Sequence, residues 1–108
     1  MKTEAKIQQE IIEWYRANHY KKGVIFSVPN ERTGGYVAMK PLLLTGLLSG
    51  VSDLIVVESG RVLFIEVKNE KGKQSAKQIK FQMNVENLNH IYHLVRTLED
   101  FIKIIQNK

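Results

Sequence analysis

Two carboxylates and a lysine are the residues whose types and spacing in this sequence best suit chemistry. Asp53 directly precedes an apolar run at 54–57, while Glu66 and Lys68 end a second apolar run that begins at residue 62. Because side chains alternate between the two faces of a strand, Glu66 and Lys68 are predicted to share one face. Such a set can hold a divalent cation and position a water beside a phosphate.

The four residues at 58–61 separate the two apolar runs and predict a β-hairpin. Pairing of the runs brings Asp53 to the end of the sheet where Glu66 and Lys68 lie, so we predict one site there. Each residue also has a structural alternative. Asp53 could form a turn at the start of its strand, Glu66 could face water from an edge strand, and Lys68 could be a surface lysine.

The elements around the hairpin follow from capping residues and hydrophobic periodicity. They are a helix from Thr3 to about Asn18, a strand at 24–28, the hairpin, a helix that begins at Ser75, a strand at 90–95 and a helix that begins at Thr97. The order, α-β-β-β-α-β-α, predicts an α/β fold in which helices flank a small mixed β-sheet. The segment between residues 30 and 52 is punctuated by glycines, and within it we expect residues 36–48 to form a short helix or an irregular flap.

The composition predicts one basic domain that spans residues 1–108. The chain is 44% hydrophobic, contains no cysteine and has no apolar run as long as the roughly 18 residues of a membrane span. These features exclude a disulfide framework and fit a protein of the cytoplasm with no membrane partner. The net charge of +5 and the pI of about 9.5 favour nucleic acid as the partner.

Positive charge gathers in two parts of the chain. Lys71, Lys73 and Lys77 follow the second hairpin strand, and Arg32 and Lys40 lie in the glycine-rich segment. Cations near a carboxylate pair would allow a polyanion to approach it, so we predict that these residues contact the phosphates of a nucleic acid. The alternative is a solvated lysine-rich surface.

The motifs along nearly the whole chain resemble the PD-(D/E)XK nuclease superfamily and, within it, the virus-type replication-repair nuclease (VRR-NUC) domain. In order, these motifs are Glu4 and Gln8, Asn30, Gly50-Val51-Ser52-Asp53, Glu66-Val67-Lys68, Gln78, and Val95-Arg96-Thr97. The sequence departs from the family pattern at two positions. Ser52 stands where proline is usual, and Thr97 stands where the family signature has a second arginine.

The resemblance implies a restriction-endonuclease-like core with a site for Mg²⁺ or Mn²⁺. It assigns Glu4, Asp53, Glu66 and the backbone carbonyl of Val67 as metal ligands, whose hard oxygen atoms suit these cations. Lys68 would orient the attacking water and stabilise charge in the transition state. For Glu4 the alternative is a first-turn residue that interacts favourably with the helix dipole.

Three further residues receive roles from the same resemblance. Gln78 would position Lys68 or touch the scissile strand, Asn30 would line the site, and Arg96 would contact a phosphate. For Gln78 the alternative is the capping box with Ser75, and both roles are possible if the helix starts at the site.

The resemblance implies a metal-dependent, structure-selective DNA endonuclease. Family members hydrolyse phosphodiester bonds with departure of the 3′ oxygen, and small standalone members resemble Holliday-junction-resolving nucleases that act as homodimers on branched DNA. The small format also suggests a phage gene and hence the cytoplasm of the host cell. Two alternatives stay open: a non-catalytic DNA-binding or assembly module on the same fold, and an RNA-directed nuclease.

Overall fold

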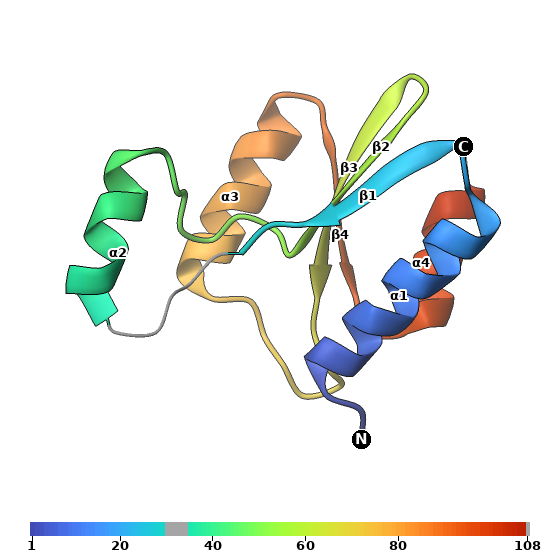
Figure 1. Ribbon diagram of the computed structural model, residues 1–108, viewed down its shortest axis with the longest axis horizontal. Coiled ribbons are helices and arrows are strands. Elements are labelled where there is room, and N and C mark those ends of the chain that lie inside the picture. The colour runs from blue at the N-terminus through green and yellow to red at the C-terminus, as the bar shows by residue number, and fades with distance from the viewer. Residues whose placement is uncertain (30–34, 108) are drawn as a thin grey trace.

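A four-stranded mixed β-sheet with helices on both faces forms the molecule (Figure 1). The computed structural model describes residues 1–29 and 35–107. Its elements are α1 (Glu4–Asn18), β1 (Gly23–Ser27), α2 (Gly35–Leu44), β2 (Leu54–Glu58), β3 (Arg61–Val67), α3 (Ala76–Asn87), β4 (Ile91–Val95) and α4 (Leu98–Gln106). The strands lie in the order β1-β2-β3-β4, and only the β3–β4 pair is parallel. The predicted α/β class and mixed sheet are confirmed, and α2 is an addition to the predicted element order.

Helices α1 and α4 cover one face of the sheet and build the larger hydrophobic core. Ile7 and Ile11 of α1 are buried, as their helical spacing predicts, in one core with Phe101 and Ile105 of α4. The third residue of the predicted stripe, Trp14, is only partly buried, and its neighbour Tyr15 is buried in its place. The sheet contributes alternate side chains to this core, namely Ile25, Leu54, Val56, Leu63, Ile65, Val67 and Val95. The alternation leaves Glu66 and Phe64 on the opposite face, as predicted.

Helix α3 covers the opposite face over β3 and β4 (Figure 1). Phe81 and Val85 of α3 are buried there with Val51 and Tyr92, and Phe64 packs edge-on against Phe81 at 5.4 Å between ring centroids. Glu66, a residue of the candidate site, lies on the same face of the sheet as this smaller core.

Side-chain caps fix the starts of three helices, as the sequence predicts. Thr3 accepts the backbone N–H of Lys6 at 3.1 Å, and Thr97 accepts that of Asp100 at 3.1 Å. Before α3, Ser75 and Gln78 form the full reciprocal capping box.

The chain between α2 and β2 is held against α3 by a glycine. Gly50 has a φ of +87°, and a Cβ at this position would lie 2.4 Å from the backbone oxygen of Lys77. Only glycine permits both the backbone conformation and the close approach. Figure 1 shows this segment beside α3, with α2 standing farther from the sheet. The contact fixes the chain three residues before Asp53.

Within the described ranges, none of the helices has both the length and the hydrophobicity of a membrane span.

Candidate active site

Asp53 and Glu66 face each other at one end of the β2–β3 hairpin. The register pairs Leu54 with Ile65, so Asp53, one residue earlier, lies opposite Glu66, one residue later. The Asp53 carboxylate accepts the backbone N–H of Val67 at 2.9 Å. This bond joins β3 to the residue before β2, so the Asp53 side chain bonds across the strands and is fixed in place.

Glu66 is a fully buried carboxyl group that lies close to the carboxyl of Asp53. Its residue is 0% exposed, and neither carboxylate oxygen has a partner among the described residues. Burial, together with the nearby Asp53 carboxyl, raises the pKa of Glu66 well above its ordinary value, whereas the charge of Lys68 acts in the opposite direction. Since β3 lies between β2 and β4, the alternative that Glu66 faces water from an edge strand is wrong.

The residues that could hold a metal are a pair of carboxylates rather than a larger cluster. No three His, Cys, Asp or Glu side chains of the described residues are arranged to hold one ion together. Glu4, the third predicted ligand, lies in the first turn of α1, and its carboxylate accepts the backbone N–H of Asn69 at 3.4 Å. Its role as a ligand stays a prediction.

The loop that follows Lys68 brings α1 and β3 together. A Cβ at Gly72 would lie 2.8 Å from a Glu4 carboxylate oxygen and 3.2 Å from Cδ of Lys68, so Gly72 fits closely between these two side chains. The Asn69 side chain folds the loop by accepting the backbone N–H groups of Lys71 and Gly72 at 3.0 and 2.8 Å. Glu4 and Lys68 are therefore neighbours, as the prediction of one site requires.

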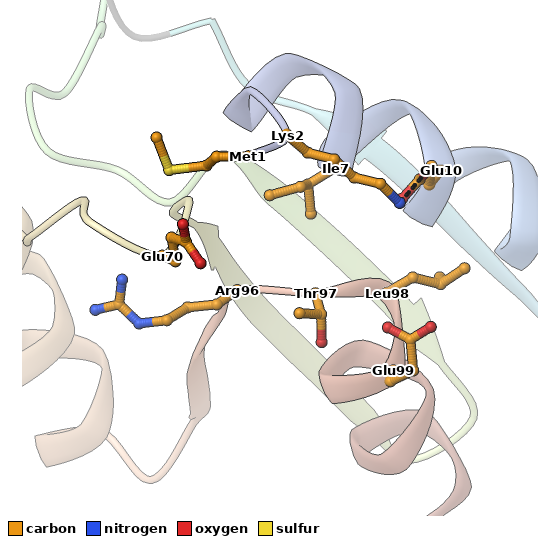
Figure 2. Close-up of a pocket in the computed structure, with 9 residues that line it drawn as sticks. All are labelled: Met1, Lys2, Ile7, Glu10, Glu70, Arg96, Thr97, Leu98 and Glu99. Carbon is orange, nitrogen blue, oxygen red and sulfur yellow. Dashed lines mark hydrogen bonds and ion pairs between the residues drawn. The ribbon is translucent and has the colours of Figure 1, made fainter.

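Arg96 holds the same loop from its other side. One guanidinium nitrogen, Nη1, donates to the backbone carbonyls of Asn69 at 2.6 Å and Gly72 at 2.8 Å. The pocket of about 210 Å³ that Arg96 lines also contains the carboxylates of Glu70 and Glu99 and an ion pair between Lys2 and Glu10, at 2.7 Å (Figure 2). Carboxylates repel a phosphate, so this geometry favours a positioning role for Arg96 over the predicted phosphate contact.

The remaining predicted residues lie around this centre or outside the described part. Gln78 is half-buried, and its side-chain oxygen accepts the Ser75 N–H at 2.8 Å, so the capping alternative is confirmed and its role at the site stays a prediction. Lys71 and Lys73 are exposed on the loop after β3, Lys77 is exposed in the first turn of α3, and Lys40 is exposed on α2. Asn30 and Arg32 lie outside the described residues.

Sequence reasoning missed a polar chain beside the two carboxylates. Gln74 donates to Gln82 at 2.9 Å and to the Tyr92 hydroxyl at 3.1 Å. Tyr92 pairs with Phe64 and so lies on the face of the sheet that holds Glu66. Burial raises the pKa of Tyr92, and the charges of Glu66 and Asp53 raise it further. One signal was present in the sequence, because strand alternation puts Tyr92 on the face of β4 that pairs with the Glu66 face of β3.

Two solved structures resemble this fold over nearly the whole chain. One, described as a VRR_NUC domain protein, superposes with a TM-score of 0.79 at 17% identity. The superposition covers 98% of this chain and 87% of the chain of that protein. The other, described as a VRR_NUC domain, superposes with a TM-score of 0.67 at 20% identity and covers 98% of each chain. No protein-family model and no curated protein matches the sequence. This chain therefore has the fold of the VRR_NUC domain.

Proposed function

We propose that this protein is a VRR-NUC-type endonuclease that hydrolyses phosphodiester bonds of DNA with Mg²⁺ or Mn²⁺. The observation that supports this most is the Glu66 carboxylate, which is fully buried without a donor and lies opposite Asp53. A buried, unpaired carboxylate costs stability unless a proton or a cation neutralises it. A cation-binding site explains why such a residue is kept.

The residues present fit a hard divalent cation. Asp53 and Glu66 offer carboxylate oxygens, and the Val67 carbonyl lies between Glu66 and Lys68 in the sequence. Mg²⁺ and Mn²⁺ favour such oxygens, and Mg²⁺ usually binds through one or two carboxylates and keeps several waters. When bound, the ion would polarise the phosphate and lower the pKa of a water.

The side chains around this pair have roles that follow from charge and position. The Lys68 ammonium would stabilise the negative charge that develops on the phosphate. Glu4, beside Gly72 and Lys68, would accept a proton or a hydrogen bond from water at the site. Arg96 would keep the loop between them in one conformation through its two carbonyl bonds.

The protein's charge supports DNA as the substrate. The exposed lysines Lys71, Lys73 and Lys77 lie on the loop and the helix turn that follow the candidate site, and they would contact phosphates. We further propose branched DNA as the preferred form, with a homodimer that presents two sites, in the cytoplasm of the cell. The non-catalytic module is less favoured, because binding alone requires no buried, unpaired carboxylate beside Asp53.

Cleavage of a labelled panel tests this function. The panel contains a four-way junction, a flap, a splayed arm, a plain duplex, single-stranded DNA and single-stranded RNA, each with Mg²⁺, Mn²⁺ or EDTA. We expect cutting of branched DNA with either metal, none in EDTA, and loss of cutting in Glu66→Gln. The matched control is Glu13→Gln, which changes an exposed carboxylate on α1. Tight DNA binding without cutting in either metal would leave the non-catalytic module, and cutting of RNA alone would leave the RNA-directed nuclease.

A further inference from the structure

A groove lies between the chain segment that follows α2 and helix α3. Its volume is about 210 Å³. The residues that line it are Leu48, Ser49, Lys77, Lys80, Phe81 and Asn84. Apart from Lys77, none of them belongs to the predicted site.

The groove combines apolar and cationic groups. Leu48, which is 58% exposed, and Phe81, which is 8% exposed, form its apolar part. Lys77 and Lys80 are exposed, and neither forms an ion pair with a carboxylate of the described residues. The Ser49 hydroxyl and the Asn84 amide add hydrogen-bonding groups. An apolar surface beside unpaired ammonium groups suits a ligand with a flat, weakly polar ring and adjacent negative charge.

The backbone connects this groove to the candidate active site. Ser49 stands four residues before Asp53, and the intervening Gly50 packs against the backbone of Lys77. Lys77 in turn precedes Gln78 at the start of α3. A DNA strand whose phosphate lies at Asp53 and Glu66 can therefore continue toward the groove along the start of α3.

We propose that the groove binds one unpaired base of the DNA strand that is cut, next to the scissile phosphate. The base would lie against Leu48 and Phe81, with adjacent phosphates at Lys77 and Lys80. The volume of about 210 Å³ lies below the roughly 300–1,000 Å³ of drug-sized ligand sites, which limits the occupant to a small group such as one base. This inference rests on the proposed nuclease function and adds a preference for DNA with an unpaired nucleotide beside the cut.

Binding in EDTA tests the groove separately from cleavage. The probe is a fluorescently labelled duplex with a single-stranded arm, and an abasic nucleotide is placed at each arm position in turn. Loss of a base contact typically weakens binding by about tenfold. We expect this loss at one arm position with the wild-type protein. Leu48→Ala should bind the intact probe about tenfold more weakly and should no longer distinguish that abasic position.

Two control variants make the test specific. Leu44→Ala removes another exposed leucine, on α2, outside the lining of the groove and should leave binding unchanged. Lys80→Gln should lower the slope of log affinity against log salt by about 0.7–0.9, whereas Lys103→Gln on α4 should not.

Equal effects of Leu48→Ala and Leu44→Ala, or equal sensitivity at all arm positions, would overturn the proposed base-binding role of the groove while leaving DNA binding intact. If no DNA of any form bound, the proposed function would fail with it.

Discussion

Glu66 is an ionisable side chain in a buried, apolar environment, and a function at this position accounts for it. Its neighbours in β3, Ile65 and Val67, are fully or almost fully buried apolar residues, and Glu66 is buried equally on the other face without a donor. Without a cation the raised pKa keeps this carboxyl protonated at neutral pH, and binding of a cation would require the loss of that proton. A residue type that does not suit its local environment is expected at functional sites.

Lys68 is predicted to act on the chemical step and not on binding. Lys68→Met should lower the single-turnover cleavage rate at saturating protein by at least about 100-fold, because a charge that stabilises the transition state is lost. The dissociation constant for DNA in EDTA should change little. Lys103→Met, on α4, is the control. A Lys68→Met variant with the wild-type rate would show that the ammonium has no catalytic role.

Glu58 is predicted to stabilise the fold in a pH-dependent manner. Burial opposes its charge, but hydrogen bonds from Tyr15 at 2.6 Å and from Arg61 at 2.8 Å outweigh burial and lower the pKa of Glu58. A lowered pKa in the folded state means that the stabilisation is present at neutral pH and is lost as the pH falls through that pKa. Glu58→Gln should therefore reduce the free energy of unfolding by about 1.5–3 kcal/mol at pH 7.

Urea unfolding of wild type and Glu58→Gln at pH 7 and at about pH 3, below the usual glutamate pKa, measures this effect. The difference between the two proteins should shrink at the lower pH. Glu13→Gln, with an exposed carboxylate, should show no such trend. A difference that stays constant with pH would contradict the prediction.

At the scale of elements, the loop between β3 and α3 depends on Arg96. Arg96→Gln removes its two carbonyl bonds, and the resulting movement of Lys68 and Glu4 should lower the cleavage rate by about 10–100-fold. The salt dependence of DNA binding should stay the same. A phosphate contact would instead make the salt slope smaller by about 0.9. Arg16→Gln, which removes an arginine bond to the carbonyl of Ile25, is the matched control.

The contact between the segment before β2 and α3 depends on Gly50. Gly50→Ala should lower the free energy of unfolding by about 2–4 kcal/mol, from backbone strain and from the clash with Lys77. Gly46→Ala is a close control, because Gly46 also has a positive φ, +112°, but no atom within 4 Å of the added Cβ. It should cost about 1–2 kcal/mol. If Gly50→Ala and Gly46→Ala lost equal stability in denaturant unfolding, the close approach of Gly50 to Lys77 would have no energetic effect.

At the scale of the whole molecule, local patterns in the sequence predicted most of the fold. Alternation placed Glu66 opposite the core, the hairpin brought it to Asp53, and Thr3, Ser75 and Thr97 marked three helix starts. These features depend on neighbours within a few residues. Long-range partners could not be predicted in this way.

The bonds of Arg96 to the Asn69–Gly72 loop and of Gln74 to Tyr92 join residues 18 to 27 positions apart. No local pattern encodes such pairs, since they arise only when β4 pairs with β3 and α3 packs over both. The sequence also did not decide whether α2 forms, because glycines and Pro41 give conflicting signals over that segment.

Glu66 is the proposed ligand for a divalent cation, and thermal unfolding with increasing Mg²⁺ tests this role directly. In EDTA at neutral pH, Glu66→Gln should melt close to wild type, because the raised pKa of Glu66 keeps its carboxyl protonated and both side chains are then neutral. Added Mg²⁺ should raise the melting temperature of wild type and leave Glu66→Gln unchanged. A wild-type melting temperature that does not respond to Mg²⁺ or Mn²⁺, or an equal response in both proteins, would contradict the role of Glu66 as a metal ligand.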